Sequence, residues 1–224
     1  MAAMRETPQP PPYASSRLRK PERPLLLLPG SLSERSGPVY GHGAVTEVDR
    51  DLTRQHEGSP LGQKILVGGR VVDLNGRPVR DTLIEIWQAN ASGRYSHQLD
   101  RNPAPLDPNF SGTGRCKTNA DGWYSFTTVK PGAYPWQNHE NAWRPAHIHF
   151  SVLGPEFSTR LITQMYFPGD PLFGLDPIVA SVADAEDREL MIGSLDLDLT
   201  EPGVALGYRF DIVVTRGAVV RAEH

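Results

Sequence analysis

The segment YPWQNHENAWRPAHIHF, residues 134–150, gathers side chains that can bind a metal ion. His147 and His149 stand two positions apart in a run whose intervening residues are apolar. Because successive side chains of a β-strand point to opposite faces, both imidazoles should lie on one face of a strand. Tyr134 adds a potential anionic oxygen donor, and Arg144 adds a permanent positive charge. The pattern predicts a metal site.

A solvated pair of surface histidines is the alternative explanation of the His-x-His pattern. The large aromatic side chains of Trp136 and Trp143 argue against a surface pair, because a surface strand rarely has two tryptophans nearby. Pro135 and Pro145 restrict the backbone close to the predicted site. These residues favour the metal site over the surface pair.

Strands must position these residues, and the sequence predicts six of them. Each is rich in β-branched or aromatic residues, or alternates apolar with polar positions. They are expected over Lys64–Asp73, Thr82–Asn90, Gly122–Val129, His147–Leu153, Arg160–Phe167 and Tyr208–Thr215. Asn75-Gly76 predicts a hairpin turn, and only Asp184–Leu195 is expected to be helical. Several short strands separated by turns predict a mainly β protein, a sandwich or a barrel.

Two segments lack this strand pattern. Residues 91–117, rich in Pro and Gly, predict a long loop in which Arg94, Tyr95 and His97 are candidate site residues. Residues 1–60 begin with a Pro-rich and then a basic stretch, and they include the leucine run at 25–28. That run favours an irregular arm lying on another surface over a disordered tail. We therefore expect an N-terminal arm, 1–60, and a catalytic β domain, 61–224.

Composition narrows the classes of function. A net charge of −3 over 224 residues predicts neither a nucleic-acid partner nor an acidic membrane partner. The longest aliphatic run, at 25–28, is far shorter than the roughly 20 residues that span a bilayer. A single cysteine, Cys116, excludes an internal disulfide and cysteine-based zinc or iron–sulfur sites. No secretory signal pattern is evident, and we expect a cytoplasmic protein.

Seven motifs follow one another along the chain: TLIEIWQAN, GRYSH, APLDPNF, GWYSF, VKPGAYPW, WRPAHIHF and ITQMYFPGDPL. In this order, from about Leu61 to Asp211, the chain resembles the intradiol ring-cleaving dioxygenases. The resemblance implies a β-sandwich core of the intradiol dioxygenase type, with long active-site loops and an irregular N-terminal arm. It also implies non-haem Fe(III), with four ligands: Tyr95, Tyr134, His147 and His149.

The charges of this ligand set suit ferric iron. Two tyrosinates and one hydroxide carry three negative charges, and two neutral histidines add none, so the site balances the 3+ ion. Taken alone, Tyr95 or Tyr134 would more often be a packed core tyrosine; the matching motifs reverse that expectation. By resemblance, Tyr134 and His149 are axial ligands, while Tyr95 and His147 are equatorial. The resemblance also implies that Tyr134 leaves when a catechol binds and that it accepts a catechol proton as a general base.

The resemblance assigns further roles around the metal. Arg144 stabilises negative charge that develops on the substrate, and Gln164 supports the catalytic site. Trp136 matches a substrate-pocket position. Tyr13, in the motif PPPY, resembles a tyrosine that reaches the pocket from the arm. Residues 172–181, LFGLDPIVAS, depart from the family pattern; we expect them to reshape a subunit contact without touching a predicted ligand.

The activity implied is the oxidation of protocatechuate (3,4-dihydroxybenzoate) by O2 to 3-carboxy-cis,cis-muconate. The chain resembles the iron-bearing beta type, which pairs with a homologous alpha subunit in a higher-order (αβ)n assembly. An intradiol dioxygenase for catechol or hydroxyquinol is the nearest alternative, although the Pro-rich start differs from the helical dimerisation segment of those relatives. A transthyretin-like binding module and a zinc hydrolase are the others; zinc sites seldom use two tyrosines.

Overall fold

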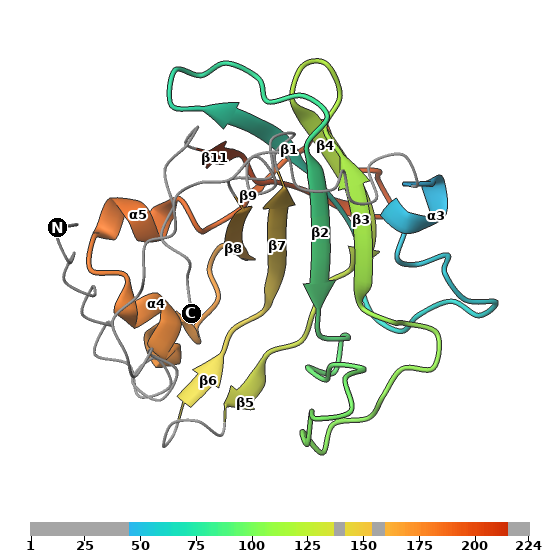
Figure 1. Ribbon diagram of the computed structural model, residues 1–224. Helices are drawn as coiled ribbons and strands as arrows, with labels where there is room; N and C mark the ends of the chain where they lie inside the picture. Colours follow the sequence, from blue (N-terminus) through green and yellow to red (C-terminus); the bar gives the residue numbers. More distant parts are fainter. Residues whose placement is uncertain (1–44, 137–141, 154–159, 215–224) are drawn as a thin grey trace, which may run out of the picture.

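The computed structural model describes residues 45–136, 142–153 and 160–214 (Figure 1). Two sheets dominate it. In the first, β1 (Lys64–Asp73) pairs antiparallel with β4 (Trp123–Val129) and parallel with two short strands; these are β10 (Leu206–Arg209) and β11 (Ile212–Val214), and β10 also pairs with β9 (Ser194–Leu195). The second sheet is antiparallel and has the order β3 (Thr113–Lys117), β2 (Leu83–Gln88), β7 (His147–Leu153), β8 (Arg160–Tyr166).

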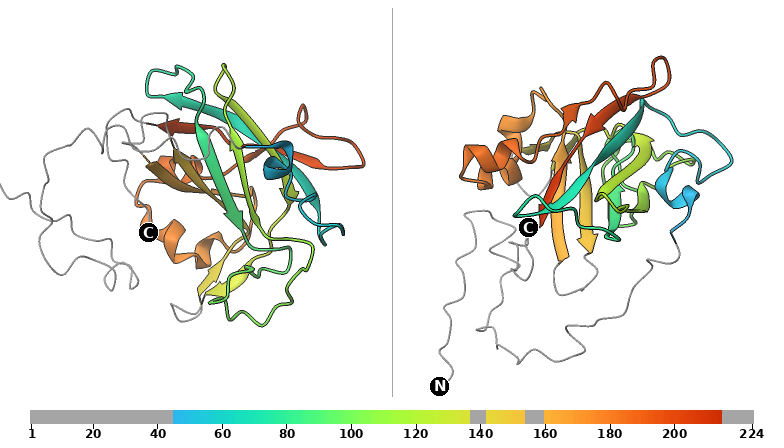
Figure 2. Two further views of the ribbon diagram at one scale, coloured as in Figure 1. Left: turned by 45° about the vertical axis from the view of Figure 1, so that its right-hand side comes forward. Right: turned by 90° about the horizontal axis from the view of Figure 1, so that it is seen from above.

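Shorter elements complete the described part of the chain. A two-stranded sheet joins β5 (Tyr134–Trp136) to β6 (Ala142–Arg144). The helical elements are α3 (Glu47–Arg50), η2 (Phe173–Leu175), α4 (Pro177–Ser181) and α5 (Ala185–Glu189). The two larger sheets lie face to face, while β5, β6 and the loop after β2 lie at one end of them (Figures 1 and 2). No helix among the described residues is long and apolar enough to span a membrane.

Apolar side chains from both large sheets fill the space between them. Ile65 of β1, Ile84 of β2 and Phe150 of β7 are fully buried in one cluster. Phe126 of β4 meets the Phe150 ring edge-on, with 5.8 Å between the ring centroids. Because Phe150 of β7 points into this core, His147 and His149 point to the opposite face of the second sheet. The prediction of a mainly β sandwich is confirmed.

The predicted strands are largely confirmed, but the predicted loop, the predicted helix and the last predicted strand each need a correction. β1 and β7 have the expected bounds. Residues 113–117 of the predicted loop form β3, and the predicted helix 184–195 shortens to α5 and is followed by β9. The expectation that only this segment is helical is wrong, because α3 and α4 are short helices as well. The predicted turn at Asn75-Gly76 is confirmed, with Gly76 at φ 73°: the chain folds back on the end of β1, where Val72 pairs antiparallel with Pro78. The following strand, β2, lies in the other sheet.

The predicted strand 208–215 is divided where β1 passes close to the chain between β10 and β11. A Cβ on Gly69 would lie 1.9 Å from the carbonyl oxygen of Phe210. Phe210 N donates to Gly68 O at 2.9 Å, and Arg70 N donates to a side-chain oxygen of Asp211 at 2.7 Å. The parallel ladder is thus interrupted by one side-chain hydrogen bond, which splits the strand in two.

Gly69→Ala is expected to destabilise the fold by about 1–3 kcal/mol, the usual cost of overpacking a tight site. The added methyl group would overlap the Phe210 carbonyl, which cannot move without breaking the β1 pairing. Gly174→Ala is the control, because a Cβ there meets nothing within 4 Å. Urea unfolding midpoints of the two variants test the prediction. Equal midpoints would contradict it.

The N-terminal arm lies mostly outside the described residues, and Tyr13 lies outside them too. The last part of the expected arm packs on the chain's own sheets. Leu52 is fully buried in the core, and its backbone N–H donates to Thr127 O at 2.9 Å. Packing of the preceding residues on a partner subunit stays a prediction.

Candidate metal centre

Four predicted ligands meet at one point beside β7. Tyr95 Oη lies 3.0 Å from His149 Nε2 and 3.4 Å from His147 Nε2. The two Nε2 atoms are 3.2 Å apart, and Tyr134 Oη is 3.5 Å from His147 Nε2. The residues come from β5, from β7 and from the loop after β2. Tyr95 and His149 are far apart in sequence, but they meet because β2 and β7 are neighbouring strands.

Glycine brings the loop of Tyr95 against the strand of Tyr134. Gly93 has φ 80°, and a Cβ there would lie 2.3 Å from the carbonyl oxygen of Ala133. Asn90 shapes the same turn, since its side-chain oxygen accepts from Arg94 N at 3.0 Å. The Tyr95 N–H then donates to Asp100 Oδ2 at 2.7 Å. Only glycine can adopt this backbone at such close approach without strain.

Both histidines are neutral, and His147 presents an unprotonated nitrogen to the meeting point. His147 Nδ1 lies 2.7 Å from the carbonyl oxygen of Pro145. A carbonyl only accepts, so Nδ1 carries the proton and Nε2 of the neutral ring carries a lone pair. Burial, then the charge of Arg144, then His149 keep the pKa of His147 well below its usual range. Burial and Arg144 lower the pKa of His149 to about 3, so both rings are neutral at pH 7.

The two phenols need a cation to ionise. Burial raises the pKa of Tyr95 well above 10, and the neighbouring Tyr134 adds to the rise. Burial also raises the pKa of Tyr134, although Arg144 opposes this. Two imidazole nitrogens and two phenol oxygens therefore lie close together. Hydrogen bonds among them cannot satisfy all of their lone pairs. A metal cation would accept all four, so the donor set fits a metal ion.

Tyrosine oxygens are required to complete this set. Among the described residues, no group of three or more His, Cys, Asp or Glu side chains is placed to hold a metal ion. A centre of two histidines and two tyrosines is nitrogen- and anionic oxygen-rich, which suits ferric iron better than zinc.

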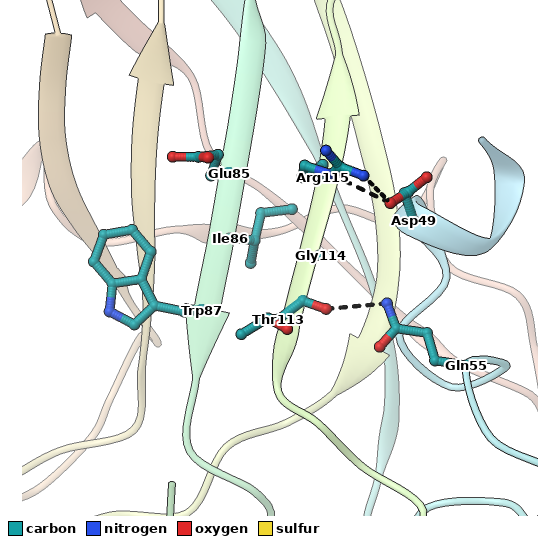
Figure 3. Close-up of a pocket in the computed structure, with 8 residues that line it drawn as sticks. All are labelled: Asp49, Gln55, Glu85, Ile86, Trp87, Thr113, Gly114 and Arg115. Atoms are coloured by element: carbon teal, nitrogen blue, oxygen red, sulfur yellow. Dashed lines mark hydrogen bonds and ion pairs between the residues drawn. The ribbon is translucent and has the colours of Figure 1, made fainter. Parts of the chain in front are cut away.

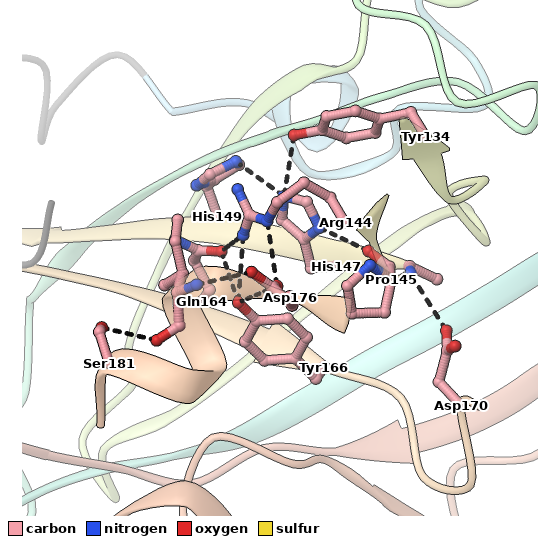
Figure 4. A network of polar contacts seen from close by, with 12 residues as sticks. Tyr134, Arg144, Pro145, His147, His149, Gln164, Tyr166, Asp170, Asp176 and Ser181 are labelled. Carbon is pink, nitrogen blue, oxygen red and sulfur yellow. Dashed lines mark hydrogen bonds and ion pairs between the residues drawn. The ribbon is translucent and has the colours of Figure 1, made fainter. Parts of the chain in front are cut away.

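Arg144 lies beside the ligands in a buried polar network (Figure 4). Its Nη2 donates to Gln164 Oε1 and, at 3.1 Å, to the Tyr166 hydroxyl, while Nε donates to Asp176 Oδ2 at 3.0 Å. The guanidinium is also 5.4 Å from the centroid of the Trp136 ring. The structure therefore brings Arg144, Gln164 and Trp136 together next to the four predicted ligands.

The sequence analysis missed two residues of this site. Asp176 belongs to residues 172–181, which were expected to affect only a subunit contact; instead, its carboxylate pairs with Arg144. The signal was present, because Asp followed by Pro and an apolar run is typical of a helix N-cap, but the cap does not reveal the second partner. Trp87 stacks on His149, with ring centroids 4.8 Å apart and planes 3° from parallel.

Two pockets lie near Trp87. One, of about 760 Å³, is also lined by Tyr95, His97 and Leu99, on the loop side of the site. The other, of about 590 Å³, lies over β2 and β3 (Figure 3). In it Arg115 donates to Asp49 at 2.7 Å and lowers the pKa of Asp49 to about 2, so these charges satisfy each other. We therefore expect the catalytic site to lie at the four predicted ligands and not in this second pocket.

Comparison with known proteins identifies the family of the chain. A family model described as Dioxygenase matches residues 35–216. The chain is 55% identical over 206 residues to the protocatechuate 3,4-dioxygenase beta chain of Burkholderia cepacia, covering 91% of this chain and 87% of that one. It is 31% identical over 198 residues to the alpha chain of the Pseudomonas putida enzyme, covering 84% and 93%.

Solved structures share the fold. The 3-chlorocatechol 1,2-dioxygenase of Rhodococcus opacus 1CP superimposes with a TM-score of 0.58 at 25% identity, over 77% of this chain and 66% of that one. Together with the matched family model and the relatives above, this shows that the chain belongs to the intradiol ring-cleavage dioxygenase family.

Proposed function

We propose that the chain is the iron-bearing beta subunit of a protocatechuate 3,4-dioxygenase. It would use O2 to open the ring of 3,4-dihydroxybenzoate between its two hydroxylated carbons, giving 3-carboxy-cis,cis-muconate. The convergence of two phenol oxygens and two imidazole nitrogens within 3.0–3.5 Å carries the proposal. The 55% identity to the Burkholderia cepacia beta chain favours protocatechuate as the substrate.

Tyr95, Tyr134, His147 and His149 would hold Fe(III) in this proposal. Two phenolates offset most of the charge of the ion, and this makes its burial tolerable. When bound, ferric iron supplies the Lewis-acid and redox chemistry that makes a catechol reactive toward O2. The protein's own residues bind and orient the catechol, exclude water and move its protons.

The two tyrosines are not equivalent. Tyr95 Oη lies 3.0 and 3.4 Å from the two imidazole Nε2 atoms, whereas Tyr134 Oη lies 3.5 Å from His147 Nε2, the longest of these contacts. Tyr134 is therefore the looser ligand and the better candidate to accept a catechol proton at its phenolic oxygen. Arg144 is opposite Tyr134 in the β5–β6 pairing, and its charge opposes the rise in the pKa of Tyr134, so the guanidinium acts directly on this phenol.

Tyr134→Phe is expected to retain iron but to slow substrate binding by about 100-fold, the lower end of the usual contribution of a general acid or base. The variant lacks the phenolic oxygen that takes up a catechol proton, while three ligands remain. Tyr208→Phe is the control, since Tyr208 is a buried tyrosine of β10 that packs against Phe167 away from the ligands. Stopped-flow mixing with 3,4-dihydroxybenzoate without O2 measures the rates. Unchanged binding by the Tyr134 variant would rule out its role as base.

The pocket is proposed to be completed by a homologous alpha subunit, because relatives of this chain include both an alpha and a beta chain. That subunit would supply groups for the substrate carboxylate, and several αβ units would assemble further. Trp136, beside Arg144, is proposed to line the substrate pocket. Tyr13 keeps the substrate-binding role that the resemblance implies, as a prediction.

The visible absorption spectrum of the protein, co-expressed with its alpha subunit, tests the proposed function. We expect a broad tyrosinate-to-Fe(III) band that shifts when 3,4-dihydroxybenzoate is added without O2. A colourless protein, with zinc or without metal, would contradict the proposal and favour a transthyretin-like binding module. A band that shifts with catechol or hydroxyquinol but not with 3,4-dihydroxybenzoate would reassign the substrate.

A further inference from the structure

Asp176 is a fully buried carboxylate whose two oxygens accept hydrogen bonds from three different elements. Its Oδ1 accepts from Ile178 N at 2.8 Å, as the N-cap of α4. Its Oδ2 accepts from Arg144 Nε at 3.0 Å and from the Tyr166 hydroxyl at 3.1 Å. Asp176 thus ties α4 to the arginine of β6, next to the metal ligands (Figure 4).

The pairing compensates a buried charge. Arg144 is 3% exposed and Asp176 is 0% exposed. A guanidinium in such surroundings loses its hydration and requires a counter-charge with good hydrogen-bond geometry. Among the ion pairs of the described residues, Asp176 is the carboxylate that pairs with Arg144. A helix cap alone would not need a carboxylate, because Ser or Asn caps a helix as well.

The network also determines which N–H donors of the guanidinium have no hydrogen bond to the described residues. Arginine has five N–H donors in a planar fork. The Nε donor goes to Asp176, and Nη2 donates to Gln164 and Tyr166. Hydrogen bonds to the described residues therefore occupy one side of the fork and leave the Nη1 donors. With three partners fixed, the plane of the guanidinium cannot rotate freely.

We propose that Asp176 is a positioning residue, which holds the Arg144 guanidinium beside the metal centre with its Nη1 edge directed to the reacting ring. The inference rests on the proposed function and adds a residue to it. Arg144 acts on negative charge that develops during ring opening, so a misplaced guanidinium should lower kcat more than it changes KM.

The test is Asp176→Asn in the iron-loaded protein co-expressed with its alpha subunit. Asn keeps the size and one capping oxygen but removes the charge, and its amide N–H cannot accept from Arg144. We expect kcat with 3,4-dihydroxybenzoate to fall about 10- to 100-fold, the usual effect of losing an outer-shell partner, with KM within about 3-fold of wild type. The tyrosinate-to-Fe(III) band and the iron content should be retained.

Asp184→Asn is a matched control. Asp184 is also an N-cap, of α5, where its side chain accepts from Glu186 N at 2.8 Å, but it is exposed and pairs with no arginine among the described residues. Its kcat should stay within about 2-fold of wild type. Asp176→Ser is the second variant, to be used if the Asn variant fails to fold, since Ser preserves the cap without the charge.

A double-mutant cycle with Arg144→Gln separates positioning from general damage. If Asp176 acts through Arg144, Asp176→Asn should cost less than about 2-fold once Arg144 has been replaced. An equal loss of kcat with and without Arg144, or an unchanged kcat in the Asp176→Asn variant, would overturn the inference. The activity of the wild-type protein would still support the proposed function. A wild-type protein inactive on every catechol would overturn the proposed function, and the inference with it.

Discussion

Replacing both His147 and His149 with alanine is expected to abolish iron binding and to lower ring-cleaving activity by more than about 100-fold, because losing two ligands must cost more than losing an outer-shell partner. The two rings supply both nitrogen donors of the proposed site, and their Nε2 atoms lie only 3.2 Å apart. The remaining phenols have raised pKa values in the buried pocket, so they would stay protonated and bind a metal weakly.

Iron per chain, measured by plasma emission spectrometry, and O2 consumption with 3,4-dihydroxybenzoate check this result. His56→Ala is the control, because His56 is exposed and lies in the segment before β1. Near-wild-type urea midpoints would show that the variants are folded; the removed rings face away from the core cluster of Ile148 and Phe150. A double variant with full iron and activity would refute the ligand assignment.

The strand that carries these histidines could be predicted from sequence because its pattern is strong. Ile148, Phe150 and Val152 alternate with polar residues, and they are all buried in the core as expected. Period-2 alternation specifies both the strand and the face. The same reasoning works less well for 208–215, where the break depends on the close approach of Gly69 to Phe210, two segments far apart in sequence.

Tyr95 shows a different limit. It lies in a loop without periodicity, and physical reasoning about the sequence gives no reason to place it beside His149. The resemblance to a family supplied that contact, and the structure shows the reason for it: Asn90 and Gly93 form a tight turn that carries the loop back over the end of β2. Turn geometry of this kind is encoded locally, but its direction depends on the packed sheet.

The role of Asp176 was found neither from the sequence pattern nor from the family resemblance. Asp176 is 32 residues from Arg144, in a segment that departs from the family pattern. A helix cap can be recognised from Asp and Pro before an apolar run, but an ion pair between distant residues requires the fold. The buried charge of Arg144 implies a partner, because a guanidinium is rarely buried alone. The sequence analysis did not show that Arg144 is buried, so it predicted neither the need for a counter-charge nor the residue that supplies it.

Arg144→Gln is expected to lower kcat by about 100- to 1,000-fold while iron binding is retained. Glutamine is similar in shape and can still donate one hydrogen bond, but it lacks the positive charge that would stabilise the anionic ring. Arg144 contributes no metal ligand in the proposed site, so the tyrosinate-to-Fe(III) band should persist. Arg144→Lys restores the charge without the planar fork, and we expect it to recover only part of kcat.

The same substitution should also destabilise the protein, because it leaves the Asp176 carboxylate buried without its cation. Breaking one side of a buried pair costs about 3–5 kcal/mol, whereas an exposed pair contributes about 1 kcal/mol or less. Arg209→Gln is the control: Arg209 pairs with Asp211 at 3.0 Å, but both side chains are over 40% exposed. Adding Asp176→Asn to Arg144→Gln should restore most of the urea midpoint without restoring kcat. A midpoint and a kcat that recover together would mean that the ion pair serves folding alone, whereas recovery of stability without activity assigns the charge of Arg144 to the reaction.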